Sequence, residues 1–150
     1  MKQFAVIGLG NFGFHAAKAL YEEGNEVLAV DMDKARIQAI DPYCTEAVVL
    51  NAADRDSLKS LGLDAMESVI ISTGTNISNS ILICLYLQEM GVKKIMAKAI
   101  DEDHAKILRK VGATDIIHPE KDMAIRIAKS LSRPNILDFI PLGEDFDLVQ

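Results

Sequence analysis

Short apolar segments alternate with longer amphipathic segments over the first 133 residues of the chain. The apolar segments are continuous runs, which is typical of strands buried on both faces of a parallel sheet. Strands are predicted at six of them: 4–7, 26–30, 46–50, 68–71, 94–97 and 115–117. Helices are predicted at six amphipathic segments: 13–23, 33–40, 54–61, 76–90, 102–111 and 121–131. Because strands joined by helices form right-handed β-α-β units, the pattern predicts an α/β fold with a doubly wound parallel sheet and helices on both faces.

The residues at the helix ends support these boundaries. Glycines follow four predicted helices, where a left-handed residue often ends a helix: Gly24, Gly62, Gly91 and Gly112. Aspartates precede three predicted helices, where a carboxylate can accept hydrogen bonds from first-turn amides: Asp33, Asp54 and Asp101. The fold class is therefore indicated by both periodicity and capping.

The first predicted strand leads directly into the segment GLGNFG at residues 8–13, which matches the G-x-G-x-x-G pattern of dinucleotide-binding turns. In that pattern Gly8 allows the tight turn, Gly10 lets the backbone approach a pyrophosphate, and Gly13 lets helix and strand pack closely. Asp31 ends the second strand, 23 residues after Gly8, where an acidic side chain binds ribose hydroxyls. A carboxylate there repels a 2′-phosphate, so NAD or an adenine nucleotide is favoured over NADP. The sequence therefore predicts a nucleotide-binding domain of the Rossmann type.

Further polar or small residues follow the third, fourth and fifth strands, at the edge where open α/β sheets bind ligands. These candidates are Asn51, Ala52, Thr73, Gly74, Asn76 and Lys98. Ordinary turn chemistry also favours Asn, Thr and Gly at such positions, and a surface role for the lysine is equally open.

The charge and the cysteines exclude several classes of protein. The 22 acidic residues outnumber the 16 basic ones, giving a net charge of -6, which argues against a nucleic-acid partner. Cys44 and Cys84 lack metal-ligand spacing and lie among apolar neighbours, so buried thiols in a reducing compartment are expected. The start of the chain does not resemble a secretory leader, and no apolar run reaches the roughly 18 residues of a membrane span. We therefore expect a cytoplasmic protein. Separately, His104 in the fifth predicted helix is expected to lie at the surface.

No set of residues suggests an enzyme. The sequence offers no Ser-His-Asp set, metal-ligand cluster, paired catalytic carboxylates or P-loop, and no substrate domain follows the nucleotide-binding segment. A nucleotide site without means to transform the nucleotide favours a sensor. The alternatives are the NAD-binding domain of an oxidoreductase and a transcriptional module, although no basic recognition helix is present.

Two apolar segments indicate assembly. Residues 81–87 are apolar on all sides of the predicted fourth helix, which implies a second buried face beyond the one against the sheet. Residues 136–140 are apolar after Pro134 interrupts the chain, and would be exposed in a lone domain. We expect the second segment to pack across a dimer partner or onto a further domain.

The segments FAVIGLGNFG, VLAVD, VIISTGTN and GATDIIHPEKDM together resemble the KTN or RCK domain, the cytosolic regulator of Trk- and Ktr-type potassium uptake systems and related channels. The resemblance covers essentially the whole chain. It implies a nucleotide-binding domain at 1–133 and a dimerisation segment from 134 to 150, with the C-terminal lobe of longer members absent. It also implies homodimers that assemble into a tetramer or an octameric ring beneath an integral membrane subunit that conducts potassium. ATP, ADP or NAD(H) would bind in the cleft and alter the shape of the ring, at the inner face of the cell membrane.

Motif and resemblance together assign these residues to nucleotide binding: Gly8, Gly10, Asn11, Phe12, Gly13, Asp31, Asn51, Ala52, Thr73, Gly74, Asn76, Lys98 and Glu120. The resemblance further implies that Glu120 lies near a neighbouring subunit's nucleotide and helps bind a divalent cation with its terminal phosphate. Asn11 stands where many members of the family carry an arginine that reaches the phosphates. Losing that charged donor should weaken triphosphate binding relative to dinucleotide binding.

Overall fold

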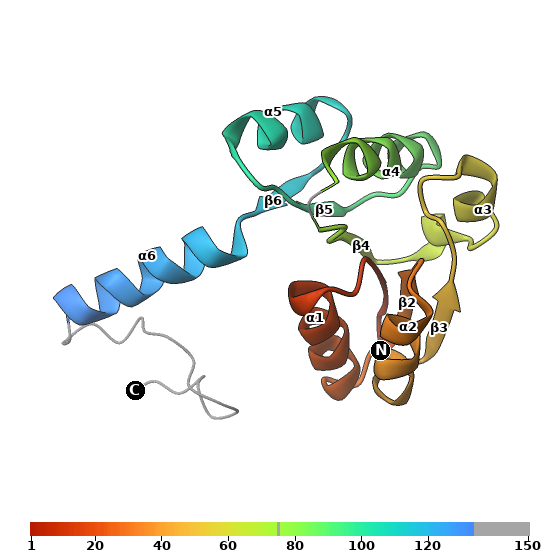
Figure 1. Cartoon of the computed structure of the whole chain (residues 1–150), viewed down its shortest axis with the longest axis horizontal. Helices are drawn as coiled ribbons and strands as arrows, with labels where there is room; N and C mark the ends of the chain where they lie inside the picture. Colours follow the sequence, from red (N-terminus) through yellow and green to blue (C-terminus); the bar gives the residue numbers. More distant parts are fainter. Residues whose placement is uncertain (75, 134–150) are drawn as a thin grey trace. The chain divides into compact units, whose positions relative to one another are not determined.

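In the computed structural model the chain forms a six-stranded, wholly parallel sheet with the strand order β3-β2-β1-β4-β5-β6 (Figure 1). The structure describes residues 1–74 and 76–133. The strands are β1 (Gln3–Ile7), β2 (Glu26–Asp31), β3 (Glu46–Val49), β4 (Ser68–Ile71), β5 (Ile95–Lys98) and β6 (Asp115–Ile117). The helices are α1 (Asn11–Glu22), α2 (Lys34–Ile40), α3 (Arg55–Lys59), α4 (Ile77–Glu89), α5 (Glu102–Lys110) and α6 (Pro119–Ser132), with short 3₁₀ helices η1 (Asp41–Tyr43) and η2 (Leu63–Ala65). This confirms the predicted doubly wound fold.

The chain divides into two units, Met1–Ile117 and a second that begins at His118. The first holds the whole sheet with α1 to α5, and the second contains α6. The predicted dimerisation segment, including the apolar residues 136–140, lies outside the described residues.

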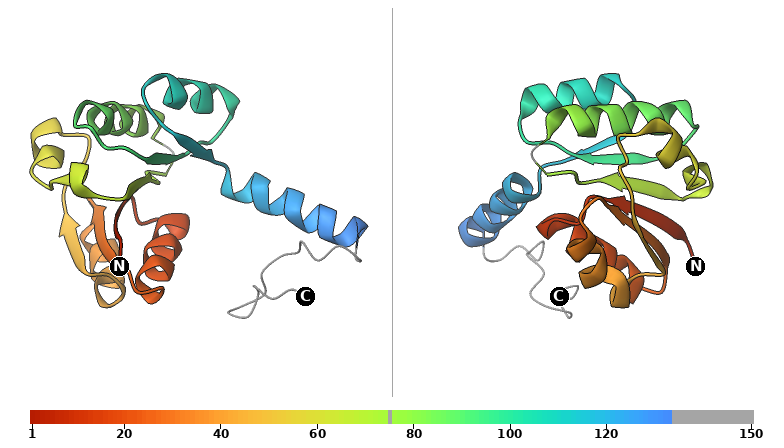
Figure 2. Two further views of the ribbon diagram at one scale, coloured as in Figure 1. Left: turned by 180° about the vertical axis from the view of Figure 1, so that it is seen from behind. Right: turned by 45° about the vertical axis from the view of Figure 1, so that its right-hand side comes forward.

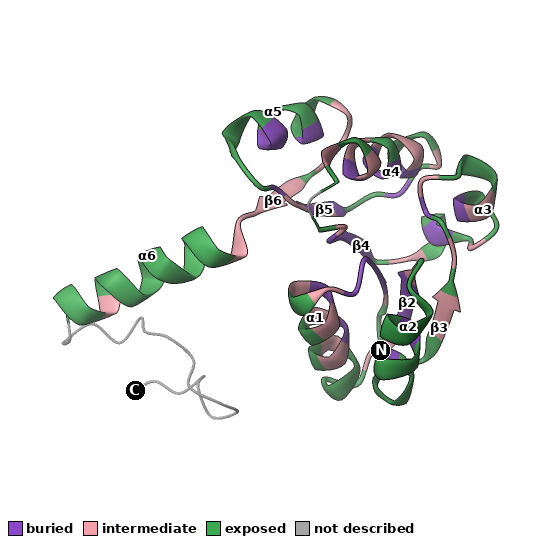
Figure 3. Cartoon of the chain, in the orientation of Figure 1, coloured by how far each residue is buried: buried purple, intermediate pink, exposed green. Residues whose placement is uncertain are grey.

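Successive side chains of the central strands enter two separate cores. Ala5 and Ile7 of β1 join a core with the side chains of α3, α4 and α5, whereas Val6 joins a second core with those of α1 and α2. The two helical layers lie on opposite faces of the sheet (Figure 2), and most residues of the strands β1, β2 and β4 between them are buried (Figure 3). Burial on both faces explains why these strands read as continuous apolar runs in the sequence.

Hydrogen bonds confirm two of the three predicted aspartate caps. The Asp33 carboxylate accepts from the Ala35 amide at 2.8 Å, and the Asp101 carboxylate accepts from the His104 amide at 2.8 Å. Asp54 precedes α3 as predicted, but its carboxylate accepts from the Ser57 hydroxyl at 2.5 Å, with no amide bond. Helices α1 and α6 each begin two residues earlier than predicted, because a glycine and a proline are both acceptable at the start of a helix.

The surface position predicted for His104 is wrong: the side chain is 2% exposed. Its Nδ1 accepts from the Ile100 amide at 3.1 Å, so Nε2 carries the proton and donates to the Ser80 hydroxyl at 2.7 Å. Ser80 in turn donates to the Ile77 carbonyl at 2.9 Å. The imidazole therefore connects the first turn of α5 to the first turn of α4, which hydrogen bonding makes possible in an otherwise apolar core.

The two cysteines are buried thiols, as predicted. Burial raises the pKa of the Cys84 thiol to about 11. Burial, with a smaller contribution from the Asp41 carboxylate, also raises the pKa of Cys44. Neither side chain has the raised thiolate fraction of a reactive cysteine.

Candidate functional site

Loops from four neighbouring strands meet at the carboxyl edge of the sheet, where β1 lies between β2 and β4 and the direction of winding reverses. Ligands of open α/β sheets bind at such a reversal. A cavity of about 140 Å³ opens there. Five of the predicted site residues line it: Gly8, Asp31, Asn51, Ala52 and Thr73. The structure thus brings together residues that are far apart in the sequence.

The three glycines of the turn have different physical roles. Gly8 has a φ of +97°, and a Cβ added there would overlap the carbonyl oxygen of Ser72. A Cβ on Gly13 would overlap the carbonyl oxygen of Gly8. By contrast, a Cβ on Gly10 would meet only the Arg36 guanidinium, 3.9 Å away, beyond its own chain neighbours and helix backbone. Gly8 and Gly13 are needed by the fold itself, whereas the space beside Gly10 is open to a ligand.

The turn ends at the positive end of a helix. Gly10 is the N-cap of α1, and its carbonyl accepts from the Phe14 amide at 2.9 Å. No side chain in the described part of the chain caps α1. First-turn amides without an intrahelical partner, together with the helix dipole, favour an anion at this position.

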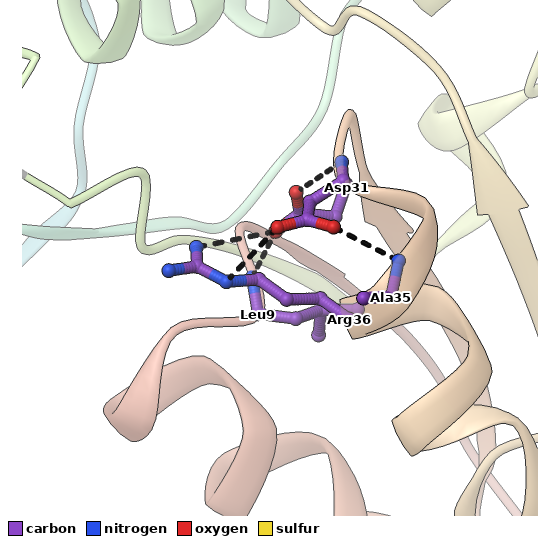
Figure 4. Close-up of polar contacts among 5 residues, drawn as sticks. Leu9, Asp31, Ala35 and Arg36 are labelled. Carbon is purple, nitrogen blue, oxygen red and sulfur yellow. Dashed lines mark hydrogen bonds and ion pairs between the residues drawn. The ribbon is translucent and has the colours of Figure 1, made fainter.

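The Asp31 carboxylate faces this turn from the end of β2 (Figure 4). Its Oδ2 accepts from the Leu9 amide at 2.7 Å, and its Oδ1 accepts from the Asp33 amide at 2.8 Å. The side chain is 10% exposed, so these bonds hold it in one orientation at the rim of the cavity. A carboxylate has about four lone-pair positions, which leaves acceptor capacity for ribose hydroxyls.

Two hydroxyls at the end of β4 lack hydrogen bonds. The Ser72 and Thr73 hydroxyl oxygens are buried and have no partner among the described residues, and both side chains line the cavity. Leaving such a group unpaired costs about 1–3 kcal/mol, so native structures usually pair it with water or a ligand.

The remaining predicted residues lie around this centre or apart from it. Asn11 lines a second, more open hollow of about 330 Å³ together with Gly10. Asn76 caps α4, its side chain accepting from the Asn79 amide at 3.0 Å, and it is Asn79 that lines the 140 Å³ cavity. Phe12, Gly74 and Lys98 line neither hollow, and their nucleotide contacts stay predictions.

Glu120 lies near the start of α6 in the second unit and is exposed. Over residues 1–74 and 76–133, no three His, Cys, Asp or Glu side chains are placed to hold a metal ion. The chain's described residues therefore form no cation site of their own around Glu120.

The sequence reading missed Arg36, in the first turn of α2. Its side chain lines both hollows, and its Nη1 lies 3.9 Å from Asp31 Oδ2. The spacing in the sequence could have identified it. Arg36 follows Asp31 by five residues and lies in the first turn of the next helix, which begins close to the end of the preceding strand.

Comparison with known proteins gives consistent matches. The model of the TrkA-N domain family matches residues 4–119. The Ktr system potassium uptake protein A of Bacillus subtilis (strain 168) is 46% identical over 149 residues, covering 99% of this chain and 67% of the relative. The Ktr system potassium uptake protein A of Vibrio alginolyticus is 40% identical, covering 99% of this chain and 68% of the relative.

Solved structures share the fold at lower identity. The NAD(P)-binding domain of an exopolyphosphatase-related protein from Archaeoglobus fulgidus superposes with a TM-score of 0.77 at 20% identity, over 89% of this chain and 99% of that one. The GsuK channel bound to NAD matches with a TM-score of 0.71 at 16% identity, over 84% of this chain and 23% of that one. In the described part of this chain, no helix combines the length and apolar character needed to cross a bilayer.

Proposed function

Because this chain belongs to the TrkA-N domain family, we propose that it is a cytoplasmic, nucleotide-binding regulatory subunit that gates a potassium transporter or channel. The relatives with the highest identity reported above are named as potassium uptake proteins of Ktr systems, and the alignment extends over almost the whole chain. This family membership favours regulation over the alternative of an oxidoreductase cofactor domain.

The open space beside Gly10 is the observation that carries the nucleotide-binding part of the proposal. Gly10 is the one glycine of the turn whose place the fold leaves open to a side chain. It lies at the N-terminal end of α1, close to Arg36. A phosphate seated there would receive backbone amides and the helix dipole. The unpaired hydroxyls of Ser72 and Thr73 and the acceptor capacity of Asp31 border the 140 Å³ cavity, and Arg36 lines both that cavity and the hollow beside Gly10, so the residues present fit a nucleotide.

NAD(H) and ATP or ADP are the proposed ligands. Gly8, Gly10 and Gly13 would hold the phosphates and Asp31 the ribose, with Asn51 and Thr73 at the adenosine end. Among the solved neighbours, GsuK is recorded with NAD and with ADP, which supports these two classes of ligand. With ATP, Glu120 would supply one ligand to a divalent cation at the terminal phosphate of the nucleotide held by a neighbouring subunit.

In this proposal the chain works as a switch in an assembly. Homodimers of the chain would build a ring on an integral membrane subunit that conducts potassium. A nucleotide shifts the equilibrium between two ring shapes only by the difference in its affinity for them. ATP and its competitor must therefore contact the cleft differently in the two shapes.

The test is calorimetric titration of the purified chain with ATP, ADP, NAD and NADH, with its mass followed by light scattering. We expect submillimolar binding of more than one nucleotide by a dimer or larger ring, and recovery of every nucleotide unchanged. Gly10→Val is the matched control, because it fills the space beside the turn and should abolish binding. Hydride transfer from NADH to a small carbonyl compound, or NAD(H) binding by a monomer alone, would instead favour the oxidoreductase domain.

A further inference from the structure

A cationic side chain lies between the ribose carboxylate and the phosphate turn. Arg36 is the only Lys or Arg among the described residues that line the two hollows. Its Nη1 lies 3.9 Å from Asp31 Oδ2 and 3.9 Å from the position that a Cβ on Gly10 would occupy. The guanidinium therefore borders the space in which a phosphate would lie.

The present partners of Arg36 hold it weakly. Both ion pairs, to Asp31 and to Asp33, have N–O separations of 3.9 Å, and the arginine side chain is 53% exposed. Ion pairs of such length and exposure contribute little, so the guanidinium can change partners at small cost. Figure 4 shows it reaching from α2 across the Asp31 carboxylate toward the Leu9 backbone.

The negative charges at the cleft favour a cationic side chain at this position. A nucleotide with two or three phosphates brings several negative charges to a rim that already carries the carboxylates of Asp31 and Asp33. The N-terminus of α1 offers the equivalent of about half a positive charge, and its first residue, Asn11, is neutral. Arginine presents a planar fork of donors that matches phosphate oxygens in pairs.

We propose that Arg36 is a phosphate-binding residue of this site, which exchanges its pairing with Asp31 for the 5′-phosphates of a bound nucleotide. The assignment rests on the proposed nucleotide function and names a determinant of its ligand class. The exchange releases one partner from Asp31 Oδ2 when ribose hydroxyls need that acceptor. Phosphate and ribose are thereby recognised together, and the cleft selects nucleotides over nucleosides.

The test compares adenosine, AMP, ADP and ATP as calorimetric ligands of the full chain and of Arg36→Gln. We expect Arg36→Gln to weaken ADP and ATP binding about tenfold or more, and adenosine binding less than about twofold. Arg36→Lys should recover part of the affinity, because it restores the charge without the fork. Lys34→Gln, two residues away on α2 and likewise exposed, is the matched control and should leave all four affinities within about twofold.

The outcomes separate this assignment from the proposed function. If the unaltered chain binds none of the four compounds nor NAD, the proposed function fails, and this assignment with it. If the unaltered chain binds ADP and Arg36→Gln binds it equally well, only the assignment to Arg36 is refuted. An equal loss for adenosine and ADP would show that Arg36 contacts the base or the ribose. A loss confined to NADP, measured beside NAD, would place its partner at the 2′-phosphate; both results overturn the proposal.

Discussion

Alanine substitutions at the three glycines of the turn should separate ligand binding from folding. The structure gives each glycine a different environment, as a Cβ would overlap backbone at Gly8 and at Gly13 but meets only the flexible end of Arg36 at Gly10. Gly10→Ala should therefore lose nucleotide affinity and keep its stability. Gly13→Ala should lose stability, and binding only as a consequence.

The magnitudes follow from these environments. At Gly10, the less favourable N-cap costs up to about 1 kcal/mol, and the reduced freedom of the unfolded chain returns about 0.4–1 kcal/mol, so the net change should stay within about 1 kcal/mol. At Gly13, overlap with the Gly8 carbonyl forces the backbone to move, at a cost of about 3 kcal/mol or more. Gly8→Ala adds the strain of a φ of +97° to its own overlap with Ser72, so a comparable loss is expected there.

Urea denaturation measures the stabilities and calorimetric titration with ADP and NAD measures the affinities. We expect Gly10→Ala to unfold at nearly the urea concentration of the parent chain while binding each nucleotide at least about tenfold more weakly. A folded Gly10→Ala variant with unchanged affinity would refute the position assigned to the phosphates. A Gly13→Ala variant as stable as the parent would refute the packing argument.

Three further predictions concern other residues. Asp31→Ala should weaken the binding of every ribose-bearing ligand and reduce the preference for NAD over NADP, and a calorimetric preference that persists in the variant would contradict the ribose role. The pKa of Cys84 is raised to about 11 in the folded chain, so the thiol ionises first in the unfolded chain. The free energy of unfolding should therefore fall by about 2–3 kcal/mol as the pH rises from about 9 to 11, and this contribution is fully retained below pH 9. In urea denaturation over that range, the free energy of unfolding of Cys84→Ala should fall less steeply with pH. His104→Phe should cost about 2 kcal/mol in urea denaturation, because it leaves the Ile100 amide without its acceptor, and an unchanged midpoint would show that this bond contributes nothing.

The sequence predicted the sheet and the turn because both depend on local patterns. All six strands lie where apolar runs occur, and the boundaries of β4 and β6 agree to the residue. The position of Asp31 beside the glycine turn could be predicted because its distance from Gly8 along the chain is fixed by the length of one β-α-β unit. Periodicity, glycine spacing and capping are each properties of short segments, so they can be recognised in the sequence without knowledge of the tertiary structure.

Features that depend on side chains from separate elements could not be predicted. His104 reads as a surface residue within a charged helix, and the approach of Ser80 on α4, a separate element, gives its buried ring a partner at Nε2. Arg36 reads as an ordinary helix residue until the loop after β1 is placed beside it. The η1 and η2 turns were likewise missed, since they join elements whose spacing is set by packing.

Helix α4 links the cavity to the outer side of the helical layer and to the start of α5. Asn79 in its first turn lines the cavity, whereas Leu82, three residues later, is 37% exposed on the outside. Its 13 residues extend about 20 Å, and a helix of that length is stiff along its axis. The hydrogen bonds from His104 to Ser80 and from the Ile100 amide to His104 fix the start of α5 to the same rod. A displacement of α4 by a ligand at Asn79 would consequently move the exposed Leu82 side chain and the start of α5 together with the helix.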